Sequence, residues 1–254
     1  MLETITAVTN PAVKRLKALL EAKGRKAENA FLVEGEVMIR EALGSGLIPK
    51  EALFENESKL IDELNGVPTR LCSRRVLEAV CDTVTPQGAV CAFELPKQTL
   101  MPADARLMLA LDGVQDPGNL GTILRTADAA GFKGAYLSEK CADVYSPKVQ
   151  RAAMGSGFRI PTLRSGLVDT LEKLRTEGWL IVCSLLDGDP LYQAELPSKT
   201  ERLILVIGNE ARGISEEVQA LADIKVKIPM RGRAESLNAA VAAGILMYEL
   251  TRNL

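Results

Sequence analysis

The chain has 254 residues, of which 47% are hydrophobic, 4% aromatic and 25% charged, and its formal net charge is −2. This length suits one or two domains, and the composition is typical of an α/β globular protein with an aliphatic core. The small net charge excludes a protein that coats a polyanion with its whole surface, but it leaves room for a local basic face.

Several absences narrow the chemistry further. The sequence has no histidine, which removes the usual general base and the Ser-His and Cys-His catalytic arrangements. Its five cysteines include no CxxC pair, so we expect reduced thiols and no metal site. No apolar run approaches the roughly 18 residues of a membrane span, and the first residues lack a signal peptide core, so we expect a cytoplasmic protein.

The first predicted element is a basic amphipathic helix in residues 10–26, "NPAVKRLKALLEAKGRK". Asn10 can cap it and Pro11 suits its first position, while the apolar residues that follow recur at helical spacing. Its basic residues either form a solvated helix face or bind nucleic acid. They are Lys14, Arg15, Lys17, Lys23, Arg25 and Lys26.

After this helix, short strands and helices alternate as far as residue 96 and predict a small α/β domain over residues 1–96. Residues 97–105 follow as a linker, because the stretch around them is polar and contains two prolines. Alternation then resumes over residues 106–254 and predicts a mainly parallel sheet with helices on both faces. Sites in such sheets lie beyond the carboxyl ends of the strands.

Three segments of the second domain follow predicted strands and crowd glycine, amide and charged residues into short turns. They read "LDGVQDPGNLGTILRTADAAGF", "VIGNEARGIS" and "IPMRGRAESLNAAVAAGILMYE". None contains GxGxxG or GxxxxGK[ST], so the phosphate loops of dinucleotide and P-loop proteins are not indicated. The feature that the three segments share is their position at the ends of predicted strands.

In the first of these segments, Asn119, Thr122 and Arg125 share one face near the start of a helix. Backbone N–H groups favour an anion there, and Arg125 can bind a phosphate through two hydrogen bonds. The alternative is a glycine-rich turn with Asn119 as helix cap and Arg125 in a salt bridge. In the third segment Ser236 can cap a helix whose small residues allow close packing.

Taken together and in this order, the three segments closely resemble the motifs of the SpoU/TrmH family of RNA ribose 2′-O-methyltransferases in the SPOUT superfamily. The resemblance covers residues 107–254. The N-terminal part is similar to the L30e-like domain that binds RNA substrate in this family. With RNA as the substrate, we expect the basic helix of this part to add phosphate contacts through Lys14, Arg15, Lys17, Arg25 and Lys26.

The resemblance implies a C-terminal trefoil knot, a homodimer and S-adenosylmethionine as cofactor. Backbone groups of the knot would hold the cofactor, and Gly208 would let the chain approach its adenosine closely. The implied cofactor-binding residues are Val206, Ile207, Gly208, Ile228, Pro229, Met230, Leu237 and Asn238, and the implied catalytic residues are Arg125, Asn119, Glu210, Ser236 and Asn238.

We therefore expect methyl transfer to a ribose 2′-hydroxyl, in ribosomal RNA rather than tRNA. Arg125 would bind the adjacent phosphate and stabilise the developing alkoxide, because a guanidinium is a poor base. Glu210 either accepts the proton or orients Arg125, and we favour orientation; Arg212 either pairs with an acid or faces RNA. Methylation of a base and a non-catalytic role in RNA binding or ribosome assembly stay open as alternatives.

Overall fold

The computed structural model describes residues 2–96, 100–194 and 202–252, and contacts divide the chain into two units. Unit 1 comprises Met1–Gln98 and Tyr145–Phe158, and unit 2 comprises Thr99–Val144 and Arg159–Leu254. The grouping of Tyr145–Phe158 with unit 1 is a feature that the predicted boundaries lack. It has a physical basis, since the Tyr145 ring lies 4.9 Å from that of Phe31. The first three residues of the predicted linker 97–105 lie outside the described residues.

Unit 1 contains a five-stranded mixed sheet with the strand order β1-β4-β3-β5-β2. The strand β5 runs antiparallel to both of its neighbours, whereas the β1-β4 and β4-β3 pairs are parallel. The strands are β1 (Thr4–Ile5), β2 (Ala30–Glu34), β3 (Pro49–Phe54), β4 (Thr69–Cys72) and β5 (Ala89–Glu94).

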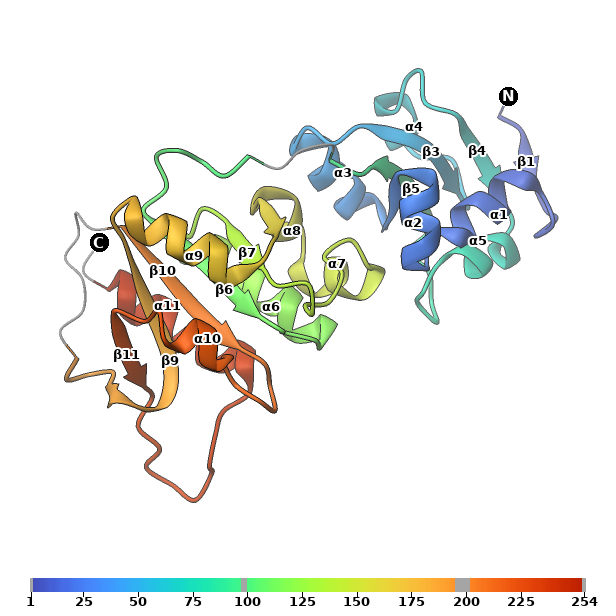
Figure 1. The fold of residues 1–254 in the computed structure, drawn as a ribbon. Coiled ribbons are helices and arrows are strands. Elements are labelled where there is room, and N and C mark those ends of the chain that lie inside the picture. Colours follow the sequence, from blue (N-terminus) through green and yellow to red (C-terminus); the bar gives the residue numbers. More distant parts are fainter. Residues whose placement is uncertain (1, 97–99, 195–201, 253–254) are drawn as a thin grey trace. The chain divides into compact units, whose positions relative to one another are not determined.

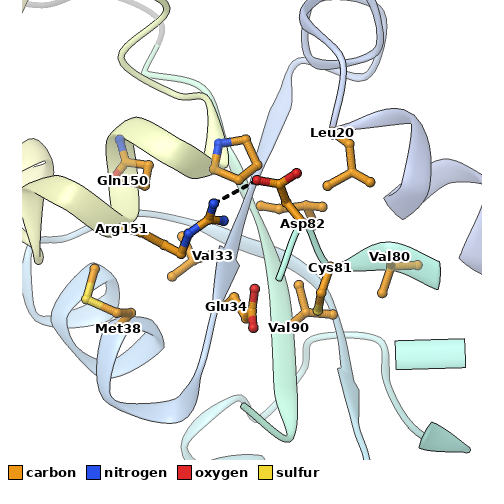
Figure 2. Close-up of a pocket in the computed structure, with 12 residues that line it drawn as sticks. Leu20, Val33, Glu34, Met38, Val80, Cys81, Asp82, Val90, Gln150 and Arg151 are labelled. Carbon is orange, nitrogen blue, oxygen red and sulfur yellow. Dashed lines mark hydrogen bonds and ion pairs between the residues drawn. The ribbon is translucent and has the colours of Figure 1, made fainter. Parts of the chain in front are cut away.

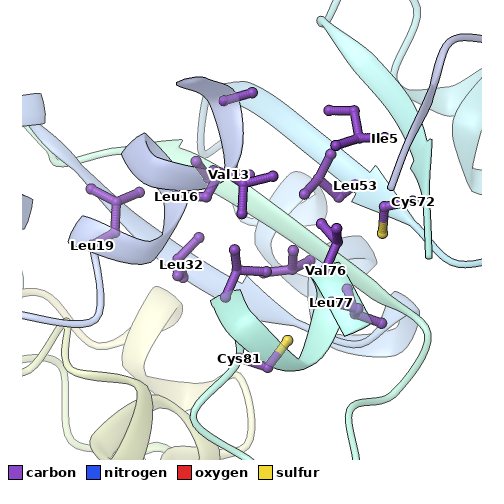
Figure 3. Close-up of a cluster of buried hydrophobic side chains, with 14 of the residues drawn as sticks. Ile5, Val13, Leu16, Leu19, Leu32, Leu53, Cys72, Val76, Leu77 and Cys81 are labelled. Carbon is purple, nitrogen blue, oxygen red and sulfur yellow. The ribbon is translucent and has the colours of Figure 1, made fainter. Parts of the chain in front are cut away.

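Successive residues of a strand point to opposite sides of a sheet, and in this sheet both sides carry apolar side chains. Helices therefore cover both faces. Figure 3 shows one of the two cores, in which Val13, Leu16, Val76 and Leu77 pack against Leu32 and the strands around it. The helices of unit 1 are α1 (Pro11–Ala18), α2 (Ala22–Glu28), α3 (Glu36–Gly44), α4 (Leu60–Glu63), α5 (Arg74–Val80) and α7 (Pro147–Ala153), and α8 (Ser156–Arg159) ends at the unit boundary.

The single helix predicted over residues 10–26 is wrong, because the structure breaks it into α1 and α2. Asn10 and Pro11 begin α1 as predicted. After α1, the Arg25 guanidinium donates hydrogen bonds of 2.8 Å to the carbonyl oxygens of Leu19 and Leu20, which satisfies groups that the break leaves free. Gly24 permits the fold-back, since a Cβ there would overlap the carbonyl of Ala18.

Unit 2 contains a six-stranded sheet with the order β11-β9-β10-β6-β7-β8, in which every pair is parallel, as the sequence predicts. The neighbouring strands β6 and β10 lie at its centre, and their last residues, Asp112 and Gly208, are in register. The strands are β6 (Leu107–Asp112), β7 (Ala135–Leu137), β8 (Thr162–Arg164), β9 (Trp179–Pro190), β10 (Arg202–Gly208) and β11 (Ile224–Lys227).

Four helices complete unit 2, and they are α6 (Pro117–Ala129), α9 (Leu167–Thr176), α10 (Glu216–Gln219) and α11 (Ala239–Thr251). The pair α6 and α11 packs together, as does the pair α9 and α10 (Figure 1). Leu171 of α9 and Val218 of α10 share a core with Ala110 and Val206 of the central strands. Within the described residues, no helix is both long enough and apolar enough to cross a bilayer.

Candidate active site

The carboxyl ends of β10 and β11 and part of β9 border a cavity of about 690 Å³. This volume lies within the 300–1,000 Å³ that is usual for small-molecule sites. The second and third motif segments supply most of its wall, and β9 supplies the rest. The lining residues are Ser184, Leu185, Leu186, Ile207, Gly208, Asn209, Glu210, Ala211, Arg212, Gly213, Lys227, Ile228, Pro229, Met230, Glu235, Ser236, Leu237, Ala239 and Ala242.

Most of the residues predicted to hold a cofactor line this cavity. Six of them do so, namely Ile207, Gly208, Ile228, Pro229, Met230 and Leu237. Val206 and Asn238 do not: Val206 is 0% exposed within the sheet, and Asn238 caps the adjacent helix α11. The wall combines apolar side chains with exposed backbone at strand ends, which suits a ligand that has both an apolar ring and polar groups.

Gly208 has a reason within the chain for being glycine. A Cβ at this position would fall within 3.0 Å of the backbone of Gly213 and Ile214. The chain returns here because Asn209 and Gly213 exchange two backbone hydrogen bonds of 2.9 Å. The Asn209 side chain also accepts from the N–H groups of Ala211 and Arg212 at 3.0 Å. The apolar strand β10 thus ends in Gly208, followed by Asn209, because these two residues close a tight turn.

Glu210 joins the second segment to the first. Its carboxylate accepts a 3.0 Å hydrogen bond from the Asn119 side chain, a 3.2 Å bond from the Asp116 N–H and a 3.4 Å bond from the Gln115 N–H. Burial alone would raise the pKa of Glu210, but the hydrogen bonds from Asn119 and the backbone outweigh it and lower that pKa. An ionised carboxylate with so many donors is a poor proton acceptor at neutral pH.

Asn238 joins the third segment to the other two. Its amide donates a 2.9 Å hydrogen bond to Asn119 Oδ1, while its own oxygen accepts from the N–H groups of Ala240 and Val241. Asn238, not Ser236, therefore caps α11, and Asp116, not Asn119, caps α6. The chain from Glu210 through Asn119 to Asn238 connects segments more than 90 residues apart in sequence.

Arg125 differs from these polar residues. It lies exposed on α6 and is not among the residues that line the cavity. Within the described parts of the chain, no acceptor binds its guanidinium, so the predicted contact with Glu210 is absent. Glu210 instead positions the turn from which α6 starts. The salt bridge that was the structural alternative for Arg125 is absent as well.

Sequence reasoning missed the contribution of β9, where Ser184, Leu185 and Leu186 reach the cavity. Leu186 is 79% exposed and offers an apolar side chain to a ligand in the cavity. The sequence gives little indication that β9 contributes to the cavity. Its place beside β10 depends on the order of the strands in the sheet, which the sequence does not show. Arg212, whose partner the sequence left open, lines the cavity without pairing with an acid in the described structure.

The predicted RNA-binding residues of unit 1 behave in two ways. Lys14, Lys17 and Lys26 are exposed. Arg25 is only 4% exposed and donates to backbone carbonyls, so its guanidinium is not accessible to RNA. Arg15 binds the Glu51 carboxylate at 3.1 Å. This surface is therefore formed by lysines more than by arginines.

A second pocket lies within unit 1 and is shown in Figure 2. It holds about 30 Å³, which is room for one or two water molecules rather than a cofactor. Asp82 and Arg151 form an ion pair of 2.7 Å at its edge. In the described part of the chain, no three cysteine or acidic side chains gather as they would around a metal ion.

Two protein families match the two parts of this chain. The chain matches the SpoU rRNA Methylase family over residues 106–248 and the MRM3-like substrate binding domain over residues 10–91. It is 39% identical to the 23S rRNA (guanosine(2553)-2'-O)-methyltransferase RlmP of Bacillus subtilis, over 98% of this chain and 99% of that protein.

Solved structures agree with the sequence relatives. An AdoMet-bound rRNA methyltransferase from Sinorhizobium meliloti has a TM-score of 0.90 at 33% identity and covers 99% of this chain and 98% of its own. A TrmH/SpoU tRNA modifying enzyme of A. aeolicus has a TM-score of 0.51 at 30% identity, with 59% of this chain and 75% of that chain covered. Since the family match spans more than half of the chain, the protein belongs to the SpoU rRNA methylase family.

Proposed function

We propose that this protein transfers a methyl group from S-adenosylmethionine to a ribose 2′-hydroxyl of ribosomal RNA. One observation carries the proposal: the second and third motif segments line one cavity, and the Glu210–Asn119–Asn238 hydrogen bonds tie the first segment to both of them. Relatives along nearly the full chain support the choice of substrate, since RlmP is a 23S rRNA 2′-O-methyltransferase and the Sinorhizobium meliloti enzyme binds AdoMet.

The residues of the cavity fit such a cofactor. Ile207, Ile228 and Leu237 offer apolar contact for an adenine ring, and the backbone of 207–208 and 228–230 offers polar groups. The bound cofactor supplies an electrophilic methyl group. The task of the protein is then to hold the 2′-hydroxyl in line with that methyl group and to exclude water.

Arg125 is the cationic group we assign to RNA. Its guanidinium has no acceptor in the described chain and can therefore bind a phosphate next to the target ribose. From there it would stabilise the alkoxide that develops on the 2′-oxygen. Glu210 and Asn119 position α6, on which Arg125 lies, and do not themselves accept the proton.

The trefoil knot, the L30e-like character of unit 1 and the homodimer belong to the same proposal. The resemblance of residues 107–254 to SPOUT enzymes supports the knot. A dimer is supported by an apolar face on α11, where Val241 is 52% exposed and Tyr248, two turns later, is 56% exposed. A Tyr248→Glu variant should sediment as a monomer if this face joins two copies, whereas an unchanged dimer would place the interface elsewhere.

The test of function is transfer of label from S-adenosylmethionine to RNA. Purified protein is incubated with total bacterial RNA that lacks native methylation, and the labelled RNA is sized and digested to nucleosides. We expect a 2′-O-methylated nucleoside in the large ribosomal RNA, formed much more slowly by Arg125→Ala. A methylated base would indicate different chemistry, label in tRNA a different substrate, and RNA binding without any label a non-catalytic protein.

A further inference from the structure

Most arginines of this chain are engaged within the protein. The sequence contains 17 arginines, and 12 of them have a hydrogen bond, ion pair or ring contact within the chain. The other five have no such partner among the described residues. They are Arg75, Arg125, Arg212, Arg231 and Arg233.

The positions of these five arginines are not scattered. Four of them belong to the three motif segments at the ends of the strands of unit 2, and only Arg75, on α5, belongs to unit 1. Arg212 lines the cavity. Arg231 and Arg233 lie in the loop of residues 228–238, which Figure 1 shows extending from the sheet between β11 and α11.

Both limbs of this loop reach the cavity, since Ile228–Met230 line it on one limb and Glu235–Leu237 on the other. Residues 231–234 between them are exposed. Arg231 and Arg233 therefore lie on the exposed part of a loop whose two limbs line the cavity, and they do not line it themselves. Small residues, Gly232 and Ala234, alternate with them and leave both guanidinium groups open to an incoming ligand.

The acids nearby do not neutralise these arginines in the described structure. The Glu210 carboxylate is occupied by Asn119 and two backbone N–H groups. Glu235, on the same loop, is exposed and lies in no ion pair with Arg231 or Arg233. Arg212, Arg231 and Arg233 thus carry positive charges that no carboxylate pairs with in the described structure, although the net charge of the chain is −2.

We propose that Arg212, Arg231 and Arg233 bind backbone phosphates of the RNA strand next to the target ribose. This inference rests on the proposed function and adds to it a surface that sets affinity for RNA at the catalytic unit itself. Guanidinium groups match phosphate geometry through two parallel hydrogen bonds, and free arginines need not break internal pairs to form them. Arg125 would serve the reacting nucleotide, and these three its neighbours along the strand.

The test measures how the affinity for RNA depends on salt. Each phosphate contact to a single strand contributes about 0.7 to the slope of log K against log salt concentration. The double variant Arg231→Gln/Arg233→Gln should therefore lower the slope by about 1.4 and raise KM for RNA. Its affinity for S-adenosylmethionine and its kcat at saturating RNA should match the wild type, because neither side chain lines the cavity.

The matched control is Arg75→Gln, which removes a guanidinium from unit 1 that is also exposed and has no partner among the described residues. Its salt slope should equal that of the wild type. A second variant, Arg231→Lys/Arg233→Lys, keeps both charges and should restore most of the slope. Circular dichroism and sedimentation of each variant report whether fold and oligomeric state are kept.

Three results would overturn the inference. They are an unchanged slope in the double glutamine variant, a loss of about 0.7 in Arg75→Gln, which is the same loss per arginine, and a change of oligomeric state, which would assign the arginines to a contact between copies. Failure of the proposed function looks different: the wild-type protein would then methylate no RNA. A wild type that methylates RNA with an unchanged slope in the variant refutes only the arginine surface.

Discussion

Arginine is used differently in unit 1 and at the strand ends of unit 2. In unit 1, Arg70 and Arg15 share the Glu51 carboxylate, Arg74 binds Glu55 at 3.0 Å, and Arg151 binds Asp82 (Figure 2). Around the cavity of unit 2, Arg125, Arg212, Arg231 and Arg233 bind no acid within the described residues.

The difference follows from what the carboxylates do in each place. Near the cavity, Glu210 accepts from Asn119 and backbone N–H groups, and Asp112 accepts from the N–H and hydroxyl of Ser215 at 2.8 and 2.7 Å. These acids hold turns and leave the arginines unpaired. Since an exposed ion pair adds only about 0–1 kcal/mol, an unpaired surface arginine costs the fold little. Such an arginine is available to an anionic ligand.

Replacing an unpaired arginine should therefore remove activity and leave stability intact. For Arg125→Ala we expect kcat to fall by about 10²–10³, which is typical for loss of one group that stabilises developing charge. The melting temperature and the affinity for S-adenosylmethionine should stay as in the wild type, because the guanidinium contacts neither the described chain nor the cavity wall. Single-turnover methylation, calorimetry and cofactor titration measure the three quantities.

The matched control for this variant is Arg75→Ala, which should change none of them. If Arg125→Ala retains full turnover, neither the phosphate role nor the alkoxide role of Arg125 holds. If Arg125→Ala melts at a lower temperature than the wild type, Arg125 contributes to stability. The contrast between the paired arginines of unit 1 and the unpaired arginines of unit 2 then does not hold at this residue.

The reverse behaviour is expected where arginines are paired. Glu51 is only 11% exposed at its side chain and accepts from both Arg15 and Arg70. In Glu51→Gln an amide N–H would face guanidinium donors, so we expect a loss of about 1–3 kcal/mol in the free energy of unfolding. Urea titration measures this loss, and methylation well below the melting temperature should keep its kcat. If kcat instead fell by a factor that corresponds to about 1–3 kcal/mol, Glu51 and its two arginines would contribute to catalysis.

The sequence predicted those features of the fold that depend on local backbone preferences. Asn10 and Pro11 favour the start of a helix whatever the rest of the chain does, and α1 begins there. The alternation of strands and helices was enough to predict the parallel sheet of unit 2. The meeting of the three segments followed from a general rule about strand ends and from the family resemblance.

Other features required the third dimension. The break between α1 and α2 depends on Arg25 reaching back to two carbonyl groups, which no periodicity shows. The cap of α6 could not be chosen between Asp116 and Asn119 from sequence, because both residue types cap helices well. Whether Glu210 contacts Arg125 or the turn at Asp116 depends on the register of β6 and β10.

A smaller effect is expected from Glu210, which acts through position alone. In Glu210→Gln, an amide N–H would replace the oxygen that faces the Gln115 N–H, and that charge-assisted hydrogen bond would be lost, while the remaining oxygen could still accept from Asp116 and Asn119. We expect kcat to fall about tenfold, which corresponds to roughly 1.4 kcal/mol. Cofactor affinity should change less than kcat.

The pH dependence separates positioning by Glu210 from proton transfer. The pKa of Glu210 is lowered in the folded protein, so its hydrogen bonds persist above its ordinary pKa and are lost only as pH falls through the lowered value. Between about pH 6 and 9 the profiles of the wild type and Glu210→Gln should therefore be parallel. A limb in this range that disappears in the variant would identify Glu210 as the proton acceptor.

The smallest effect is expected at the lysines of unit 1. Lys14 and Lys17 are exposed on α1, whereas Arg15 between them is bound to Glu51 and is left in place. If the lysines contact RNA, Lys14→Gln/Lys17→Gln should lower the salt slope of RNA binding by at most about 1.4, with kcat at saturating RNA unchanged. A slope equal to that of the wild type would mean that this face is only solvated. The unpaired arginines of unit 2 would then provide the cationic contacts to RNA, and unit 1 would have to recognise RNA by other groups.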